Sequence, residues 1–333
     1  MLFRSGIAHG TVTVIINSEP FEVTTFRVDG EYKDGRHPES VSFTATVDGD
    51  LARRDFTVNA MAYNHNEGLI DLFGGREDLK RGIIRAVGDP FVRFSEDALR
   101  ILRALRFSSV LGFKIDENTE RAIFELFPTL DLISGERIYQ ELKKLVSGVG
   151  AFRILDKYSE VISSFIPSFS LISLPEREKF ESLSAEHRLA LILSRIGSEN
   201  LRQARARLKL DNKSYMLAEA VALGAPPKDS SDRELGLYLL RMKSDSAAVA
   251  LVAIAEAYGE LPEGTLRRTK ALIEADFPRT VGHLKIDGRD IVSLGFVGKA
   301  ISDAQAKALF AVASGEIANE RRALLNFLES IKD

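Results

Sequence analysis

The sequence predicts an α+β chain in which a small, β-containing N-terminal part is followed by an all-α remainder. Residues 11–47 contain β-branched runs separated by turn residues, and from residue 51 onward apolar residues recur at helical intervals. Hydrophobic residues make up 45% and charged residues 28% of the 333 positions, which is ordinary globular composition. This length corresponds to about two domains of roughly 150 residues each.

The first predicted elements are two strands that form a hairpin. Residues 11–16 and 21–27 are rich in β-branched side chains, and the turn residues 17–20 lie between them. The polar, glycine-containing segment 29–38 predicts a flexible loop. Residues 41–47 alternate in polarity and predict a third strand.

After about residue 90 nearly every segment is predicted to be helical. Leu99, Leu102 and Leu105 recur at near-helical spacing within 97–110, and Ser134 precedes a further helix as its expected N-cap. The remaining predicted helices cover residues 185–223, 231–259, 263–276 and 302–332.

Composition excludes several classes of protein. The chain has 45 Lys and Arg against 48 Asp and Glu, so it lacks the strongly basic coat of some nucleic-acid-binding proteins, although a local basic groove remains possible. Without cysteine it cannot form disulfides or thiolate metal sites, which agrees with a cytoplasmic location. No apolar run reaches about 18 residues and no signal peptide is present, so no membrane association is expected.

Two polar clusters offer groups for binding phosphates. In the first, Arg53, Arg54, Asp55 and Asn59 are predicted to share a helix and to present donors for phosphates and ribose hydroxyls. In the second, residues 71–75 end in Gly-Gly, which allows close backbone approach. Taken alone, the first cluster could be a charged, solvated turn, and the second a plain turn between a strand and a helix.

A third cluster places Asp97, Arg100, Arg103 and Arg106 three residues apart on one predicted helix. Positions three apart are neighbours, about 5–6 Å between Cβ atoms, so Asp97 and Arg100 would present an acceptor beside a donor fork. That combination suits the edge of a nucleobase, and further arginines suit a triphosphate. The alternative is a surface salt bridge with solvated arginines.

These clusters, in this order, resemble the motifs of class II tRNA nucleotidyltransferases, the CCA-adding enzymes, and of the closely similar bacterial poly(A) polymerases. The resemblance covers residues 6–145 densely and the rest thinly. It implies an incomplete nucleotidyltransferase head over 1–90, nucleotide-recognition neck helices over 91–150, and an all-α body and tail over 151–333 that bind tRNA. The matching stretches are 6–14, 21–27, 53–62, 71–79, 96–107, 111–113, 133–142, 286–291 and 315–321.

The resemblance implies template-free addition of C, C and A to the 3′ end of tRNA from CTP and ATP, with Mg²⁺ as cofactor. By likeness, Arg54 contacts the nucleotide, Asp97 and Arg100 hydrogen-bond to the base edge, and Arg103 and Arg106 complete the pocket. The oligomeric state is not implied.

Two further segments gain an interpretation from the resemblance. Asp34, Gly35 and Arg36 lie where the family has a mobile loop associated with the switch to ATP, which argues against an enzyme that adds only C. A basic stretch on a predicted helix suits the phosphates of the tRNA acceptor arm, although it could be one solvated face. Its members are Arg202, Arg205, Arg207, Lys209 and Lys213.

The metal site is where the sequence departs from the family. Family members carry Gly-Gly-x-Val-Arg-Asp and Asp-x-Asp segments before the stretch matched by 6–14, and no counterpart precedes Thr11. Glu22 is a candidate accessory carboxylate, or an exposed strand residue; Asp48 and Asp50 have the right spacing but lie in a predicted loop. We therefore expect that upstream sequence is missing and that the 333-residue chain has little or no catalytic activity. The alternative functions are a poly(A) polymerase on RNA and a truncated, non-catalytic relative that binds tRNA or nucleotide.

Overall fold

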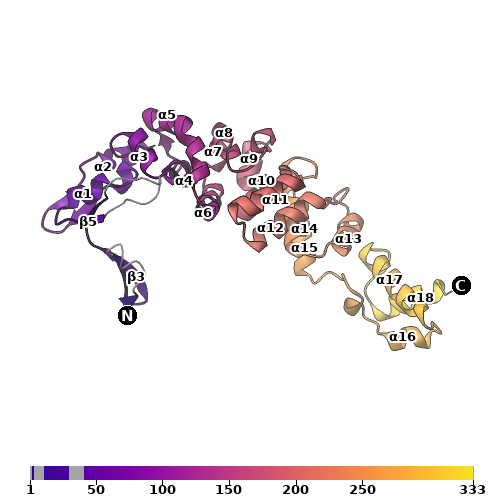
Figure 1. Ribbon diagram of the computed structural model, residues 1–333. Helices are drawn as coiled ribbons and strands as arrows, with labels where there is room; N and C mark the ends of the chain where they lie inside the picture. Colours follow the sequence, from indigo (N-terminus) through magenta and orange to yellow (C-terminus); the bar gives the residue numbers. More distant parts are fainter. Residues whose placement is uncertain (1, 4–10, 30–40, 333) are drawn as a thin grey trace. The chain divides into compact units, whose positions relative to one another are not determined.

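The computed structural model describes residues 2–3, 11–29 and 41–332 (Figure 1). The chain divides into two compact units: unit 1 is Met1–Leu171 with Arg202–Leu210, and unit 2 is Ile172–Leu201 with Asp211–Asp333. The predicted ranges 1–90, 91–150 and 151–333 do not coincide with these units. The predicted head and neck share unit 1, where strand β8 (Ile83–Ile84) pairs in parallel with β9 (Lys114–Ile115).

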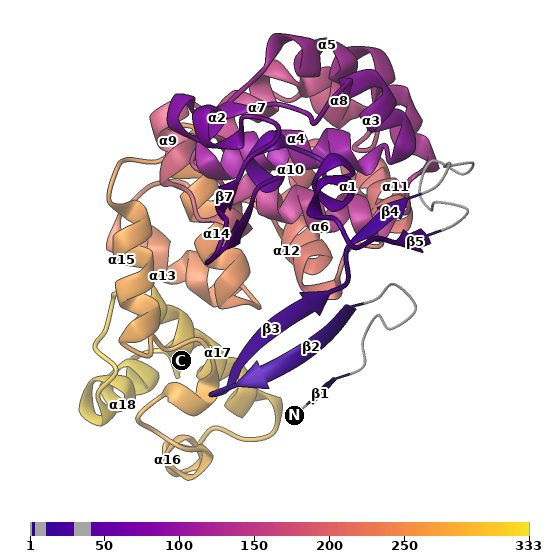
Figure 2. The same cartoon turned by 90° about the vertical axis from the view of Figure 1, so that its left-hand side faces the viewer.

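The predicted N-terminal hairpin is confirmed. Strand β2 (Thr11–Ile16) pairs antiparallel with β3 (Glu19–Thr24), as Figure 2 shows, and β1 (Leu2–Phe3) pairs with the other edge of β2. The connection has two residues instead of the predicted four: Asn17 and Ser18 have φ of 51° and 67°. Two consecutive left-handed residues match the twist of a hairpin, which allows β3 to begin before Pro20.

The next predicted strand is shorter than expected. Strand β5 (Val41–Phe43) pairs antiparallel with β4 (Arg27–Asp29), so Arg27 belongs to this second pair and not to the first hairpin. Helix α1 (Val47–Ala52) begins where the third strand was predicted to end. Asp48 and Asp50 lie in its first turn, where negative charge is favoured by the helix dipole.

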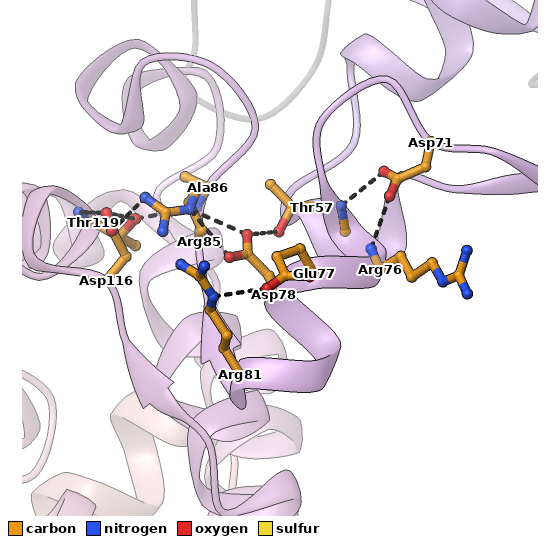
Figure 3. A network of polar contacts seen from close by, with 11 residues as sticks. Thr57, Asp71, Arg76, Glu77, Asp78, Arg81, Arg85, Ala86, Asp116 and Thr119 are labelled. Atoms are coloured by element: carbon orange, nitrogen blue, oxygen red, sulfur yellow. Dashed lines mark hydrogen bonds and ion pairs between the residues drawn. The ribbon is translucent and has the colours of Figure 1, made fainter.

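A hydrogen-bonded network connects the elements that follow (Figure 3). Asp78 of helix α2 (Gly75–Arg81) accepts from the hydroxyl of Thr57 at 2.7 Å and from Nε of Arg85 at 3.1 Å. Nη1 of Arg85 reaches Oδ1 of Asp116, just before α5 (Glu117–Leu126), at 2.5 Å. These contacts fix α2, β8 and α5 together.

The expected turn at 71–75 is confirmed between β7 (Gly68–Ile70), the partner of β6 (Ala62–Asn64), and α2. Asp71 accepts from the amides of Gly75 at 2.7 Å and Arg76 at 2.9 Å (Figure 3). Gly75 also needs to lack a side chain, because a Cβ there would lie 2.1 Å from the carbonyl oxygen of Thr57.

The remaining helices of unit 1 surround a core in which α4 packs on α6. Leu102 and Leu105 of α4 and Ile138 and Leu142 of α6 are fully buried. These helices are α3 (Pro90–Glu96), α4 (Leu99–Leu111), α6 (Gly135–Val146), α7 (Ala151–Lys157) and α8 (Ser159–Ser163).

Every regular element described in unit 2 is a helix, which confirms the predicted α+β class with a mostly helical remainder (Figure 1). The two-residue strand β9 is an exception within the predicted all-α neck. The predicted helix over 302–332 is two helices, because Gly315 adopts a left-handed φ of 74° after the first. The helices are α9 (Arg177–Ser182), α10 (Ala185–Arg195), α12 (Asn212–Leu223), α13 (Asp232–Arg241), α14 (Asp245–Ala257), α15 (Thr265–Glu274), α16 (Gly288–Ser293), α17 (Lys299–Ala313) and α18 (Arg321–Ser330). Helix α11 (Ser198–Leu208) crosses from unit 2 into unit 1. Over the described part of the chain, no helix has the length and apolar character needed to span a membrane.

Candidate functional site

A pocket of about 520 Å³ in unit 1 gathers the first polar cluster of the sequence and three of the four residues of the third. We call it the arginine pocket. Its lining comes from the segment after α1, the junction of α3 and α4, α4 itself and the first turn of α6, namely Arg53, Arg54, Asp55, Asn59, Asp97, Leu99, Arg100, Arg103, Phe107 and Arg137. Four predicted nucleotide-binding residues are therefore together: Arg54, Asp97, Arg100 and Arg103.

The first wall is organised by Asp50, whose carboxylate is buried in α1. Oδ1 accepts from Nη2 of Arg53 at 2.6 Å, and Oδ2 accepts from Nη2 of Arg54 at 3.0 Å. The prediction that the basic pair lies within a helix is wrong, because α1 ends at Ala52. Burial opposes ionisation of Asp50, but the hydrogen bonds and charges of the two arginines outweigh it and hold the pKa of this carboxyl below its usual value. The arginines are thus oriented by a group that does not line the pocket.

The second organising group is Asp55, which lies in the turn after α1 and is also buried. Oδ2 accepts from Nε of Arg103 at 2.6 Å, while Oδ1 accepts from the amide of Phe56 at 2.9 Å and from Nδ2 of Asn59 at 3.1 Å. The guanidinium of Arg103 also lies 5.5 Å from the ring centre of Phe107. Arg103 is therefore held in place from two sides.

Asp97 does not lie on the helix predicted for it. It caps the end of α3 in an extended conformation, and its Oδ1 accepts from the amide of Leu99 at 3.1 Å at the start of α4. Its Oδ2 accepts from Nη2 of Arg137 at 2.7 Å. The first amides of a helix lack partners inside the helix, so a preceding Asp side chain satisfies one of them and separates α3 from α4.

Arg100 faces a different carboxylate from the one predicted. Its Nη1 pairs with Glu96 and donates to the carbonyl oxygen of Arg93 at 2.9 Å, and its Nη2 donates to the carbonyl oxygen of Arg53 at 3.2 Å. The predicted side-by-side arrangement of Asp97 and Arg100 on one helix is wrong, although both residues line the same pocket. Arg100 instead connects α3, α4 and the turn after α1.

Arg106 is not part of the pocket lining, contrary to the prediction. Its Nε forms a 2.5 Å ion pair with Oε2 of Glu141 on α6, and its guanidinium lies 3.8 Å from the ring centre of Phe107. An α-helix has 3.6 residues per turn, so residues spaced by three drift by about 60° per step. From Arg100 to Arg106 the drift is about 120°, which turns Arg106 from the pocket towards α6.

The side chains of the pocket are held by ion pairs between five arginines and four carboxylates. Arg53 and Arg54 pair with Asp50, Arg100 with Glu96, Arg103 with Asp55 and Arg137 with Asp97. Arg54 is the most exposed of the five, at 46% of its side chain. These ion pairs fix the arginine donors before an anionic ligand binds, so binding does not pay the entropic cost of ordering their side chains.

The described residues do not fit a metal ion. Across residues 2–3, 11–29 and 41–332, no three His, Asp or Glu side chains are grouped as a metal would require. Glu22 is exposed on β3 opposite Thr13, and Asp50 is occupied by two arginines. The predicted loop residues Asp34, Gly35 and Arg36 lie outside the described residues.

Sequence reasoning missed Arg137 and the supporting carboxylates Asp50 and Glu96 as parts of the site. The sequence marked Arg137 only as a residue of a predicted helix, forty positions after the aspartate that it contacts.

One member of the predicted basic stretch is used within the fold. Arg207 donates to the carbonyl oxygens of Ile133 at 3.1 Å and Leu130 at 3.3 Å. This member of the stretch therefore has a structural contact of its own.

The chain is similar to known proteins over most of its length. A "Poly A polymerase head domain" model matches residues 1–85, and a "Probable RNA and SrmB-binding site of polymerase A" model matches residues 112–160. A CCA-adding enzyme of Geobacillus stearothermophilus is 36% identical over 336 residues, which cover 97% of this chain and 82% of that protein.

Solved structures give the same result. The crystal structure of a Bacillus stearothermophilus CCA-adding enzyme in complex with CTP matches with a TM-score of 0.75 and 30% identity, over 100% of this chain and 84% of that one. A complex of a CCA-adding enzyme with ATP matches with a TM-score of 0.62 and 25% identity, over 97% of this chain and 78% of that one.

Proposed function

The chain belongs to the family of CCA-adding enzymes, and we propose that its arginine pocket binds CTP and ATP during the template-free addition of C, C and A to the 3′ end of tRNA. The observation that carries this proposal is the convergence of Arg54, Asp97, Arg100 and Arg103 on one pocket. A volume of about 520 Å³ lies within the range of small-ligand sites.

The chemistry of the pocket suits a nucleotide that is selected without a template. Cytosine and adenine both carry an exocyclic amine that can donate a hydrogen bond, where uracil and guanine carry a carbonyl oxygen. The carboxylate of Asp97 supplies the acceptor for that amine, and Arg100 is the donor proposed for the neighbouring ring nitrogen. Arg54 and Arg103 contribute positive charge and planar donors for the triphosphate and ribose.

The part that these residues play is to bind and orient the nucleotide. Nucleotidyl transfer uses a divalent metal ion to stabilise charge on the transferred phosphoryl group, and we propose Mg²⁺ for this role. Because the described residues do not fit a metal, no step of the reaction is assigned through it. Glu22 remains a proposal for an accessory carboxylate.

The proposed polynucleotide substrate is tRNA, bound through its phosphates by the helical remainder of the chain. Family membership and the match of residues 112–160 to an RNA-binding model support this proposal. The absence of cysteine supports a cytoplasmic location.

Two measurements test the proposed function. Titration of the chain with each of the four ribonucleoside triphosphates should show tighter binding of CTP and ATP than of UTP and GTP, and equal binding of all four would overturn the proposal. The second is incorporation of labelled nucleotides, with Mg²⁺, into a tRNA that lacks its CCA end, where any incorporation should require CTP before ATP. Extension with ATP alone would favour a poly(A) polymerase. Selective binding without incorporation is the result expected of the 333-residue chain, in which no Asp-x-Asp segment precedes Thr11, and it fits both a shortened enzyme and a non-catalytic relative.

A further inference from the structure

The aspartate proposed to read the base is held on both of its carboxylate oxygens. Oδ1 of Asp97 accepts from the amide of Leu99 at 3.1 Å, and Oδ2 accepts from Nη2 of Arg137 at 2.7 Å. Two contacts from different elements fix the plane of a carboxylate that one contact would leave free to rotate. Each oxygen has a second lone pair, so the group can still accept a hydrogen bond from a ligand.

The ion pair with Asp97 is the main polar contact of the Arg137 side chain. Its side chain lines the arginine pocket, and Asp97 is its ion-pair partner across the described residues. Its other terminal nitrogen, Nη1, is buried and makes no hydrogen bond with the part of the chain that the structure describes. A buried donor left unpaired costs stability, so the ion pair with Asp97 is the contact that accounts for the position of this guanidinium.

The backbone that carries Arg137 is itself fixed. A Cβ on Gly135 would lie 1.7 Å from the carbonyl oxygen of Arg207, so α6 begins in close backbone contact with the end of α11. Ile138 and Leu142 of α6 are fully buried against α4. The guanidinium therefore projects towards Asp97 from a rigid support, as a group that orients another must.

We propose that Arg137 is a positioning residue for nucleotide selection: by holding Oδ2 of Asp97, it aims the carboxylate so that bases with an exocyclic amine are accepted and bases with a carbonyl there are rejected. This inference rests on the proposed function, because it assumes that Asp97 meets the base. It assigns selectivity to a residue forty positions away from Asp97 and on a different helix.

The chain offers a matched control one turn further along α6. Glu141 pairs with Arg106 of α4 and is outside the pocket lining, so Glu141→Gln weakens the contact of α6 with α4 without touching Asp97. If Arg137 acted only by docking α6 on α4, both substitutions would have the same effect on nucleotide binding.

The experiment compares Arg137→Ala, Arg137→Lys and Glu141→Gln with the unmodified full chain. For each, the dissociation constants of CTP, ATP, UTP and GTP are measured by titration calorimetry, and folding is checked by thermal unfolding. We expect Arg137→Ala to lower the preference for CTP over UTP, and for ATP over GTP, by about tenfold. Arg137→Lys should restore part of the preference, and Glu141→Gln should leave both ratios unchanged even where it lowers the melting temperature.

An unchanged ratio in Arg137→Ala, or an equal loss in Glu141→Gln, would overturn the inference. If Arg137→Ala does not fold, Arg137→Lys becomes the deciding variant. Because a lysine cannot reproduce the planar donor fork, it must reduce the preference for CTP over UTP and for ATP over GTP measurably. A parent chain that binds all four nucleotides equally would instead overturn the proposed function, so the two failures are distinguishable.

Discussion

Nε of Arg103 donates to Oδ2 of Asp55 at 2.6 Å, so a buried carboxylate in the turn after α1 holds an arginine of α4. The same carboxylate uses Oδ1 to accept from Phe56 and Asn59 within its own turn. Two segments that are 48 residues apart in the chain are thereby locked into one wall of the pocket. The geometry of the pocket thus depends on residues that need not touch a ligand.

The first prediction concerns this contact. Asp55→Asn would turn an amide towards Arg103 and leave the guanidinium without its anionic partner. We expect the free energy of unfolding to fall by about 1–3 kcal/mol, and CTP and ATP affinities to fall together because Arg103 loses its orientation. Urea unfolding and nucleotide titration measure the two effects. Asp48→Asn, an exposed carboxylate of α1, is the control, and a similar loss there would contradict the assignment.

The lowered pKa of Asp50 predicts that its contribution to stability depends on pH. Burial opposes its ionisation, but hydrogen bonds from Arg53 and Arg54 hold its folded-state pKa below the unfolded value. A lowered pKa contributes stability that is fully present above the unfolded value of about 3.9 and is lost as the pH falls through the folded value. The difference in unfolding free energy between the parent and Asp50→Asn should therefore be largest near neutral pH and shrink below about pH 4. Urea unfolding at several pH values measures it, and a constant difference would contradict the role given to the two arginines.

The Arg106–Glu141 pair predicts an effect on stability without an effect on binding. Both side chains are largely buried, so Glu141→Ala leaves an uncompensated charge and should cost about 3 kcal/mol of unfolding free energy. Replacing both residues, as Arg106→Met with Glu141→Leu, should recover most of that loss. The double variant should bind CTP and ATP like the parent chain. Weaker nucleotide binding by a fully folded double variant would mean that Arg106 contributes to the nucleotide pocket after all.

The sequence predicted the elements whose side-chain pattern is local. The hairpin of β2 and β3 follows from two runs rich in β-branched residues with turn residues between them, and the turn before α2 follows from Gly74 and Gly75. Asp97 could not be assigned in the same way, because an aspartate before a helix and one in its first turn have nearly the same local sequence. Its capping of Leu99 decides between them, and only the structure shows it.

The residues that line the pocket were predicted more accurately than the ion pairs that they form. Arg54, Arg100 and Arg103 were found from local charge and from the family resemblance. A spacing of three residues extended the same arginine stripe to Arg106, where the drift of the helix turns the side chain away. Arg137 required knowledge of how α6 packs on α4, which depends on contacts far apart in the sequence.

Two adjacent glycines give a matched test of the turn before α2. A Cβ at Gly75 would meet the backbone oxygen of Thr57 at 2.1 Å, so Gly75→Ala must displace backbone and should cost about 2–3 kcal/mol. Gly74 has open space around it and a φ of 74°, so Gly74→Ala meets only the strain of a left-handed alanine, about 1–2 kcal/mol. Urea unfolding should rank the first variant as less stable. The reverse order would mean that the contact with Thr57 relaxes easily.

The last prediction uses the exposure of Arg54. Asp50 holds its Nη2 at 3.0 Å while 46% of the side chain is exposed, so the residue is oriented and still accessible to a triphosphate. Arg54→Ala should raise the dissociation constants of CTP and ATP by a similar factor, about tenfold, because a charge-assisted contact to phosphate ignores the base. Salt screens such contacts, so the difference from the parent should diminish as ionic strength rises towards about 1 M. Calorimetric titrations at three salt concentrations measure this, with Arg76→Ala as the control at an exposed arginine outside the pocket. A variant that loses ATP but keeps CTP would instead place Arg54 at the base and not at the phosphates.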